Sequence, residues 1–233
     1  MKVLASSIAA AAVAFCLVSP ARANLLTNGS FETPIVPAGS FTNFPTGSTL
    51  ITGWTVIGPP VSVVSGTFDT PFFPAQDGAQ WLDLTGPTSG GGGVQQAVAT
   101  TPGQTYNLSF FVGTGFGTTS TVEVLINGAP FATRTNSTPG PVINWEQFTI
   151  PFTATSASTL IGFLNLDPAG DDSNGLDNVS LDAASAVTVP EPGTVVLLGA
   201  ALAGFGFLRR RKPTQTRCLA ALECADTATT SSS

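Results

Sequence analysis

The sequence predicts an all-β protein built as a single jelly-roll β-sandwich. Between residues 24 and 189, apolar residues recur with a period of two, which is the period of a half-buried strand. The runs are short and are bounded by Gly, Pro, Asn and Asp, which favour turns. No stretch before Pro190 has the 3.6-residue period of an amphipathic helix. Many short strands separated by turns are typical of a sandwich.

The clearest predicted strand is TYNLSFFV, in which Tyr106, Leu108, Phe110 and Val112 share one face. The Asn127-Gly128 dipeptide predicts a hairpin turn directly after residue 126. Nine further segments are predicted as strands: residues 25–32, 51–58, 61–65, 79–86, 93–100, 120–128, 145–152, 158–167 and 175–182.

The first 23 residues have the plan of a secretory signal peptide. Lys2 precedes an apolar run from Val3 to Val18, and Ala21-Arg22-Ala23 fits the A-x-A cleavage pattern. We therefore expect signal peptidase to cut between Ala23 and Asn24. A retained N-terminal membrane helix is the alternative, and the well-formed cleavage site disfavours it.

A second apolar run, from Thr194 to Leu208, contains no charge. As a helix it would span about 22 Å, short of a hydrocarbon core of about 30 Å. Four cations follow it at residues 209–212, and such clusters stay on the cytoplasmic side of a membrane. We therefore expect a transmembrane helix that leaves the preceding chain outside the cytoplasm. A buried core helix, the alternative, rarely runs into four cations.

The Pro-Glu-Pro triplet, the apolar run and the Arg cluster, at residues 190–212, together resemble the PEP-CTERM sorting signal of exported bacterial proteins. The resemblance implies recognition by an exosortase-type transpeptidase, a transient inner-membrane stage, and then the cell surface or extracellular matrix. The motif residues are Pro190, Glu191 and Pro192 for recognition, with Arg209, Arg210 and Arg211 as the stop. Signals of this family end the protein soon after the Arg cluster, whereas this chain continues through a polar tail, residues 213–233, that we expect to be disordered.

One domain, residues 24–189, lies between the two terminal signals and is long enough to bury a core. It contains no Cys, His or Lys, and its eleven acidic residues and single Arg give a net charge of −10. The value of −6 for the whole chain hides this charge because the other cations lie in the two ends. So acidic a surface repels nucleic acid and anionic lipid, and leaves neutral glycans and cations as partners.

The domain also resembles a known family. It opens with NLLTNGSFE at residues 24–32 and closes with LDNVSL at residues 176–181. Between them come Gly53-Trp54, QWLDL at residues 80–84, Val94-Gln95-Gln96 and PGQTYNLSF at residues 102–110. This order resembles the DUF642-type family and its bacterial choice-of-anchor relatives. The resemblance implies a galactose-binding-like β-sandwich, and plant members of the family associate with cell-wall polysaccharide.

Oxygen ligands near the two ends of the domain suggest calcium. The opening and closing strands of a jelly roll commonly lie side by side, so Glu32 and Asp177 would meet at one edge. The loop before Asp177 adds Asp171 and Asp172. Carboxylates without His or Cys suit Ca²⁺, and we hypothesise one structural Ca²⁺ held by these four residues, with Asp182 as a weaker candidate. The alternative is that Asp171 and Asp172 are solvated turn residues.

Sugar recognition needs an aromatic face against the ring and polar groups for the hydroxyls. The alternative for each Trp of the domain is that it is a core residue, because one face of an alternating strand must be buried. Adjacent Phe72 and Phe73 point opposite ways in an extended segment, so we expect one to be exposed. The candidate sugar-binding residues are Trp54, Trp81, Trp145, Phe73, Gln95 and Arg134, with Gln96 and Asn144 as further polar partners.

Catalysis is disfavoured because a Ser nucleophile needs a base, and the domain has no His or Lys. Only carboxylate-pair chemistry remains, for which Asp77 and Asp83 are the pair to check. The sequence therefore favours a non-catalytic protein of the cell surface or matrix that binds exopolysaccharide. A purely structural matrix component without a defined ligand is the alternative, and a carboxylate-type glycosidase is a remote one.

Overall fold

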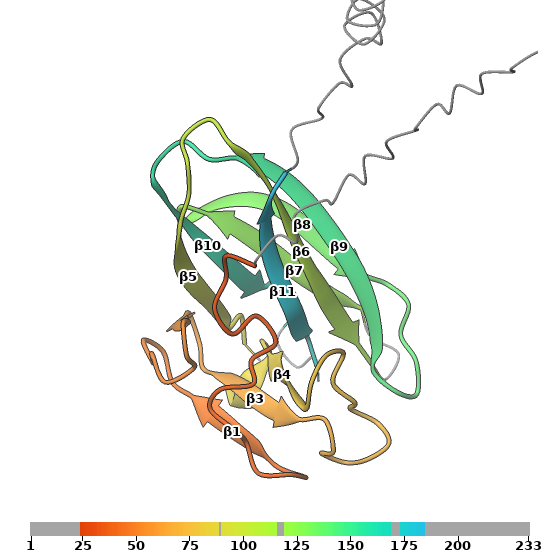
Figure 1. The fold of residues 1–233 in the computed structure, drawn as a ribbon. Helices are drawn as coiled ribbons and strands as arrows, with labels where there is room; N and C mark the ends of the chain where they lie inside the picture. Colours follow the sequence, from red (N-terminus) through yellow and green to blue (C-terminus); the bar gives the residue numbers. More distant parts are fainter. Residues whose placement is uncertain (1–23, 89, 116–118, 169–172, 185–233) are drawn as a thin grey trace, which may run out of the picture. The chain divides into compact units, whose positions relative to one another are not determined.

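The computed structural model describes residues 24–88, 90–115, 119–168 and 173–184. Within them the chain forms two antiparallel β-sheets and a single 3-10 turn, η1, Gly86–Thr88 (Figure 1). The predicted all-β class is therefore confirmed. By its contacts the chain divides into two units, Met1–Ala184 and Ser185–Ser233, and the second lies outside the described residues.

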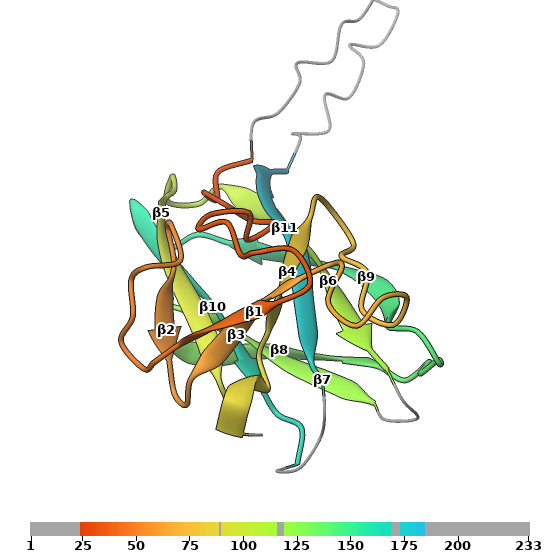
Figure 2. The same ribbon diagram turned by 90° about the horizontal axis from the view of Figure 1, so that it is seen from below.

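The first sheet has six strands in the order β1-β3-β4-β11-β6-β9. Figure 2 shows β11 between β4 and β6. Their bounds are β1 Phe41–Phe44, β3 Val61–Ser65, β4 Gln80–Asp83, β11 Gly175–Ala183, β6 Thr105–Thr114 and β9 Asn144–Thr153.

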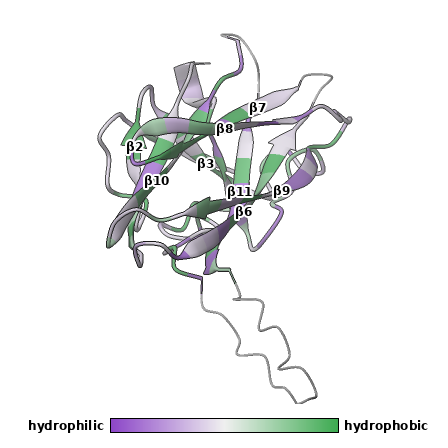
Figure 3. Ribbon diagram, turned by 90° about the horizontal axis from the view of Figure 1, so that it is seen from above, coloured by the Kyte–Doolittle hydropathy of each residue, from purple (hydrophilic) through white to green (hydrophobic). Residues whose placement is uncertain are grey.

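The second sheet has five strands in the order β2-β5-β10-β7-β8. Their bounds are β2 Thr55–Ile57, β5 Gly93–Ala99, β10 Ser158–Asn165, β7 Ser120–Ile126 and β8 Ala129–Asn136. Of the connections between consecutive strands in the described chain, β3–β4 and β7–β8 stay within one sheet, and all the others pass from one sheet to the other. Figure 3 shows the resulting layers, with β10, β7 and β8 facing β6, β11 and β9.

Alternate apolar side chains of the strands fill the space between the two sheets. In β6, all four residues predicted to share a face are buried. Across the layers, the ring of Phe110 lies 5.0 Å from that of Phe163, and Phe163 lies 6.2 Å from Trp54. Trp54 is 1% exposed, and its indole N–H donates to the carbonyl of Asn28. Trp54 is therefore a core residue.

The predicted hairpin is confirmed: Asn127 and Gly128 link β7 to β8 with φ values of 54° and 78°. Two positive φ values in succession are what a type I′ turn requires. Neither β8 nor β1 is predicted as a strand from the sequence, because most of their residues are exposed. Without a buried face, neither segment carries the apolar alternation that marks a strand.

The prediction of a strand at residues 25–32 is wrong. Asn28 and Phe31 both have a φ of 56°, a left-handed conformation that interrupts an extended strand. The segment nevertheless lies along β11, as expected for the two ends of the domain. The Leu25 amide donates to the carbonyl of Leu181, and the Val179 amide donates to that of Gly29, both at 2.9 Å.

Among the described residues, no helix has the length and apolar character needed to cross a membrane. The predicted signal peptide with its cleavage site before Asn24, the apolar segment at residues 194–208 and the Arg cluster lie outside the described part of the chain, apart from Asn24 itself.

Replacing Trp54 by Ala removes a large side chain from the centre of the core. We expect the free energy of unfolding to fall by about 3–5 kcal/mol, which is typical of such truncations. Leu50, which is 72% exposed, provides the control, and Leu50→Ala should change the free energy of unfolding by less than about 0.5 kcal/mol. Urea denaturation followed by fluorescence measures both, and equal losses would contradict the central place of Trp54.

Candidate functional site

The outer face of the first sheet, away from the core, carries a row of apolar side chains. Strand register sets Phe41 of β1 opposite Val64 of β3, and Val64 opposite Trp81 of β4. Directly opposite residues of paired strands point to the same side of the sheet. The inward position between Trp81 and Asp83 belongs to Leu82, which is fully buried in the core.

A polar row runs beside the apolar one, two residues further along each strand. Here Asn43 of β1 lies opposite Ser62 of β3, Ser62 opposite Asp83 of β4, and Asp83 opposite Gly175 of β11. Because the side-chain period of a strand is two, both rows lie on the same face. The Ser62 hydroxyl donates to the Asn43 side-chain oxygen at 2.7 Å.

The next two positions across the sheet after Asp83 are glycines, and the indole ring of Trp145 lies over them. Gly175 lies opposite Gly113 of β6, and Gly113 lies opposite Trp145 of β9. A Cβ on either glycine would fall 2.7 Å from the indole ring, so the ring lies directly over both positions. Trp145 thereby reaches Trp81, with ring centroids 5.7 Å apart and an edge-on geometry.

The loop between β3 and β4, residues 66–79, adds two aromatic side chains above the sheet. Phe73 stacks on Trp81 at a centroid distance of 6.2 Å, and the indole N–H of Trp81 donates to the Phe73 carbonyl at 3.2 Å. Phe68 meets Phe41 edge-on at 5.4 Å. The loop is held down further by the indole N–H of Trp145, which donates to the carbonyl of Pro74.

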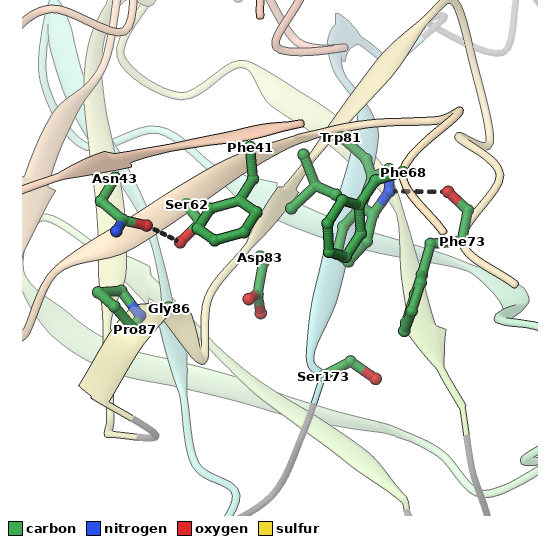
Figure 4. A pocket seen from close by; sticks show the side chains of 11 residues that line it. Phe41, Asn43, Ser62, Phe68, Phe73, Trp81, Asp83, Gly86, Pro87 and Ser173 are labelled. Carbon is green, nitrogen blue, oxygen red and sulfur yellow. Dashed lines mark hydrogen bonds between the residues drawn. The ribbon is translucent and has the colours of Figure 1, made fainter. Parts of the chain in front are cut away.

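These elements enclose a pocket of about 390 Å³ (Figure 4). Its walls are aromatic and its floor includes the polar row. The lining residues are Phe41, Asn43, Ser62, Val64, Phe68, Phe73, Trp81, Asp83, Gly86, Pro87 and Ser173. We call this the aromatic pocket.

Asp83 is the only ionisable side chain among the lining residues that the structure describes. Burial raises the pKa of its carboxyl from 3.8 to about 7, although the Thr85 amide donates to it at 3.0 Å and so favours the charged form. Near neutral pH the carboxyl is therefore divided between its protonated and ionised forms. It can act there as a hydrogen-bond donor or as an anion.

Ser173 provides a second polar group with unusual properties. It is 2% exposed, lines the aromatic pocket, and its hydroxyl has no hydrogen-bond partner among the described residues. A buried hydroxyl without a partner costs free energy, so such groups usually meet a ligand or a water molecule. Figure 4 shows Ser173 on the side of the pocket away from the Asn43–Ser62 hydrogen bond.

A family comparison matches residues 24–181 to "Protein of unknown function (DUF642)". The chain belongs to the DUF642 family. A second match, at residues 188–212, is to the PEP-CTERM protein-sorting motif. Both resemblances seen in the sequence are thus confirmed, and a search of curated proteins found no match.

Solved structures share the fold of this DUF642 domain. A cyclase from Fischerella sp. TAU, in complex with 4-(1H-indol-3-yl)butan-2-one, is 19% identical with a TM-score of 0.54, and the match covers 72% of this chain and all of the cyclase. A family 35 carbohydrate-binding module from Clostridium thermocellum is 12% identical with a TM-score of 0.42, covering 61% and 99% of the two chains. At 19% identity the likeness to the cyclase shows the fold alone.

The DUF642 structure brings together three of the predicted sugar-binding residues, namely Phe73, Trp81 and Trp145. It places the other three elsewhere. Trp54 is in the core, so its assignment to a sugar site is corrected. Gln95 of β5 and Arg134 of β8 belong to the second sheet, where β10 and β7 separate their strands.

The further polar candidates also have structural partners. Gln96 is buried and exchanges two hydrogen bonds with the backbone of Thr27. The Asn144 side chain donates to the carbonyl of Thr138. Of the adjacent pair in the loop, Phe72 is 37% exposed and Phe73 is partly buried, so one of the two is exposed, as expected.

The carboxylates of Glu32 and Asp177 both bind the backbone of the loop that precedes β4. Glu32 accepts from the amides of Ala79 and Gln80, and Asp177 accepts from those of Gln76 and Asp77. The two amides that Glu32 accepts both reach its Oε1, and those of Gln76 and Asp77 both reach Oδ2 of Asp177, so the two side chains have a structural role at the start of β4.

Asp171 and Asp172 lie outside the described residues, and the predicted Ca²⁺ stays a prediction. In the described part of the chain there is no cluster of three or more His, Cys, Asp or Glu side chains that could hold a metal ion.

Asp77 and Asp83, considered as a catalytic pair, have different surroundings. Asp77 is exposed, accepts a hydrogen bond from the Ser30 hydroxyl, and acts electrostatically on Asp177. Burial and, to a smaller extent, the neighbouring charge of Asp77 raise the pKa of Asp177 to about 7. Asp83 lines the aromatic pocket, and Asp77 does not.

Three residues of the aromatic pocket are not predicted from the sequence, namely Phe41, Phe68 and Ser173. Phe41 belongs to a strand that carries no apolar alternation, and Phe68 and Ser173 belong to loops. A usable signal was nevertheless present in QWLDL, where Trp81 and Asp83 alternate with Gln80, Leu82 and Leu84 and therefore share the face opposite to that of Leu82.

The raised pKa values of Asp83 and Asp177 predict a specific pH dependence of stability. At pH 5 the folded protein keeps the protons of Asp83 and Asp177, whereas the unfolded chain, with pKa values near 3.8, has lost them. Raising the pH from 5 to 8 therefore favours the unfolded state. This change lowers the free energy of unfolding, and we expect Asp83→Asn to reduce the fall by about 1–2 kcal/mol. Denaturation at several pH values between 5 and 8 measures it. Glu123→Gln, on β7, is the matched control and should leave the fall unchanged.

The contact of Trp145 with the glycine pair predicts a second effect. Gly175→Ala would push the indole away from the sheet and should lower the free energy of unfolding by about 1–3 kcal/mol. Gly115→Ala is the control, because an added Cβ there meets nothing closer than 3.6 Å. Denaturation and tryptophan fluorescence report both, and an unchanged spectrum for Gly175→Ala would show that Trp145 does not cover this site.

Proposed function

We propose that this DUF642 protein is exported and binds carbohydrate in the aromatic pocket without catalysing a reaction on it. The observation that carries the proposal is the composition of the pocket, in which Phe41, Phe68 and Phe73 offer apolar faces beside the polar row of Asn43, Ser62 and Asp83. Aromatic faces bind the apolar side of a sugar ring, and polar groups bind its hydroxyls. Both kinds of surface are present within one pocket.

Each side chain has a distinct role in this proposal. Phe41, which is 46% exposed, is the most accessible aromatic face, whereas Trp81, at 2%, supports the wall from behind. Asp83 in its ionised form accepts from sugar hydroxyls, and in its protonated form it also donates. Ser173 supplies a hydroxyl that has no hydrogen-bond partner among the described residues and can bind a ligand.

The sorting motif supports the cellular part of the proposal. PEP-CTERM motifs imply processing by an exosortase-type enzyme and thus export with a transient membrane stage. We propose cleavage by signal peptidase before Asn24, a transmembrane segment at residues 194–208, and a final place at the cell surface or in an exopolysaccharide matrix. A structural Ca²⁺ held with the help of Asp171 and Asp172 remains part of the proposal.

A structural matrix protein without a ligand is the second candidate. It is the less favoured of the two because it gives no reason for the Asp83 carboxyl and the Ser173 hydroxyl, which has no partner among the described residues, to share one pocket. The glycosidase reading has less support, since Asp77 does not share the pocket with Asp83.

Binding to immobilised polysaccharides, with calcium and then with chelator, tests the proposal. We expect saturable binding to at least one glycan class, and Phe41→Ala should weaken it by about three- to tenfold through loss of an aromatic contact. Phe131→Ala is the matched control, because Phe131 is 47% exposed but lies on β8 of the other sheet. Equal effects of the two substitutions would exclude the aromatic pocket, and absence of binding throughout would favour the structural role. Loss of binding with chelator would support the metal.

A further inference from the structure

The aromatic pocket combines four aromatic rings with one carboxyl group. Phe41, Phe68, Phe73 and Trp81 line it together with Asp83. The rings form a connected series, because Phe68 touches both Phe41 and Phe73, and Phe73 stacks on Trp81. Aromatic faces and a carboxylate both attract an organic ammonium group, the faces through their quadrupoles and the carboxylate through its charge.

No cation accompanies Asp83 among the described lining residues. The single Arg of the domain, Arg134, lies on β8 of the second sheet, where it donates to the carbonyl of Thr133. Burial without a counter-charge is what raises the pKa of Asp83. A positively charged ligand group would supply the missing partner.

Other ionisable groups near the pocket are all acidic. The loop above it carries Asp69 and Asp77, and β11 beside β4 carries Asp177, but none of the three lines the pocket. Asp171 and Asp172, which precede Ser173 in the chain, lie outside the described residues. The described surroundings therefore add negative potential and no competing cation.

The pocket also offers polar partners for the rest of such a ligand. The buried Ser173 hydroxyl lacks a hydrogen bond within the described chain. Asn43 and Ser62 lie at the end of the polar row and hydrogen-bond to each other. A simple alkylammonium ion would leave these groups unused, whereas a sugar that carries an amine presents hydroxyls to them.

We propose that the aromatic pocket selects an amino sugar with a free, protonated amine, as in a partly deacetylated polysaccharide, and that Asp83 pairs with the ammonium group. This inference rests on the proposed carbohydrate binding and names its ligand class. The net charge of −10 for the domain acts in the same direction, because it draws a polycationic glycan from a distance. The contacts with the aromatic rings and with Asp83 then select which sugar unit of the glycan binds in the pocket.

Calorimetry with two trisaccharides tests the selection. The probes are the trimer of glucosamine and the trimer of N-acetylglucosamine, which share a ring and differ in whether the nitrogen carries a charge. At pH 7 we expect the wild-type protein to bind the glucosamine trimer at least about tenfold more tightly, as a charge-assisted contact provides. Asp83→Asn should abolish the preference. Glu123→Gln, which removes the same charge from β7, should retain it.

Choline provides a second readout because its charge does not titrate. With a pKa of about 7 for Asp83, the ionised fraction rises from about one tenth at pH 6 to about nine tenths at pH 8. We expect the affinity for choline to rise by about tenfold over this range in the wild type and to stay level in Asp83→Asn. Equal affinities of the wild type and Asp83→Asn for choline at pH 8 would overturn the pairing of Asp83 with the cation.

The remaining outcomes separate this inference from the proposed function. Equal binding of the two trimers, unaffected by Asp83→Asn but weakened by Phe41→Ala, would overturn the amino-sugar selection and leave carbohydrate binding in place. Failure of every glycan to bind would overturn both. A lysine tripeptide that competes as well as the glucosamine trimer would show recognition of an amine without the sugar, and would also overturn the inference. Thermal melting of Asp83→Asn confirms that the variant is folded.

Discussion

The register of β4 between β3 and β11 is the constraint on which the site depends. It turns Leu82 into the core and sets Trp81 and Asp83 on the outer face, within reach of Phe41, Ser62 and Gly175. A shift by one residue would exchange the two faces and bury a carboxyl between the sheets. The Gln80 side chain helps to hold this register, since it accepts from the Val36 amide and donates to the carbonyls of Phe31 and Pro34.

Hydrogen bonds of polar side chains hold the opening segment of the domain to the sheets, a role that disulfides have in many exported domains. The domain has no Cys, and its opening segment has no strand. Asn24 instead binds Val179 and Leu181 of β11, Gln96 binds Thr27, and Glu32 binds the start of β4. Buried backbone groups need partners, and these amides and carboxylates supply them. These acidic and amide side chains therefore stabilise the fold by holding the ends of the domain in place.

Burial raises the pKa of Asp177 in spite of the hydrogen bonds that its carboxylate accepts. Its carboxylate is fully buried and accepts three backbone N–H groups, which favour the charged form, but desolvation has the larger effect. The pocket loop is therefore attached to β11 at Asp177 and to β9 through Trp145. Because the loop carries Phe68 and Phe73, these two attachments fix the aromatic wall. The shape of the pocket and the stability of the sheet edge depend on the same contacts.

Local sequence by itself determined the β class, the hairpin at Asn127-Gly128, the core face of β6 and the two family relationships, because side-chain period, turn chemistry and contiguous motifs are properties of neighbouring residues. Tertiary structure alone decided which aromatic residues form the site. Trp54 and Trp81 have similar local contexts, yet one lies in the core and the other behind a pocket wall. The aromatic pocket joins residues 41 to 173 through strand register and loop packing. Such pairings between distant segments set which groups meet, and no local pattern encodes them.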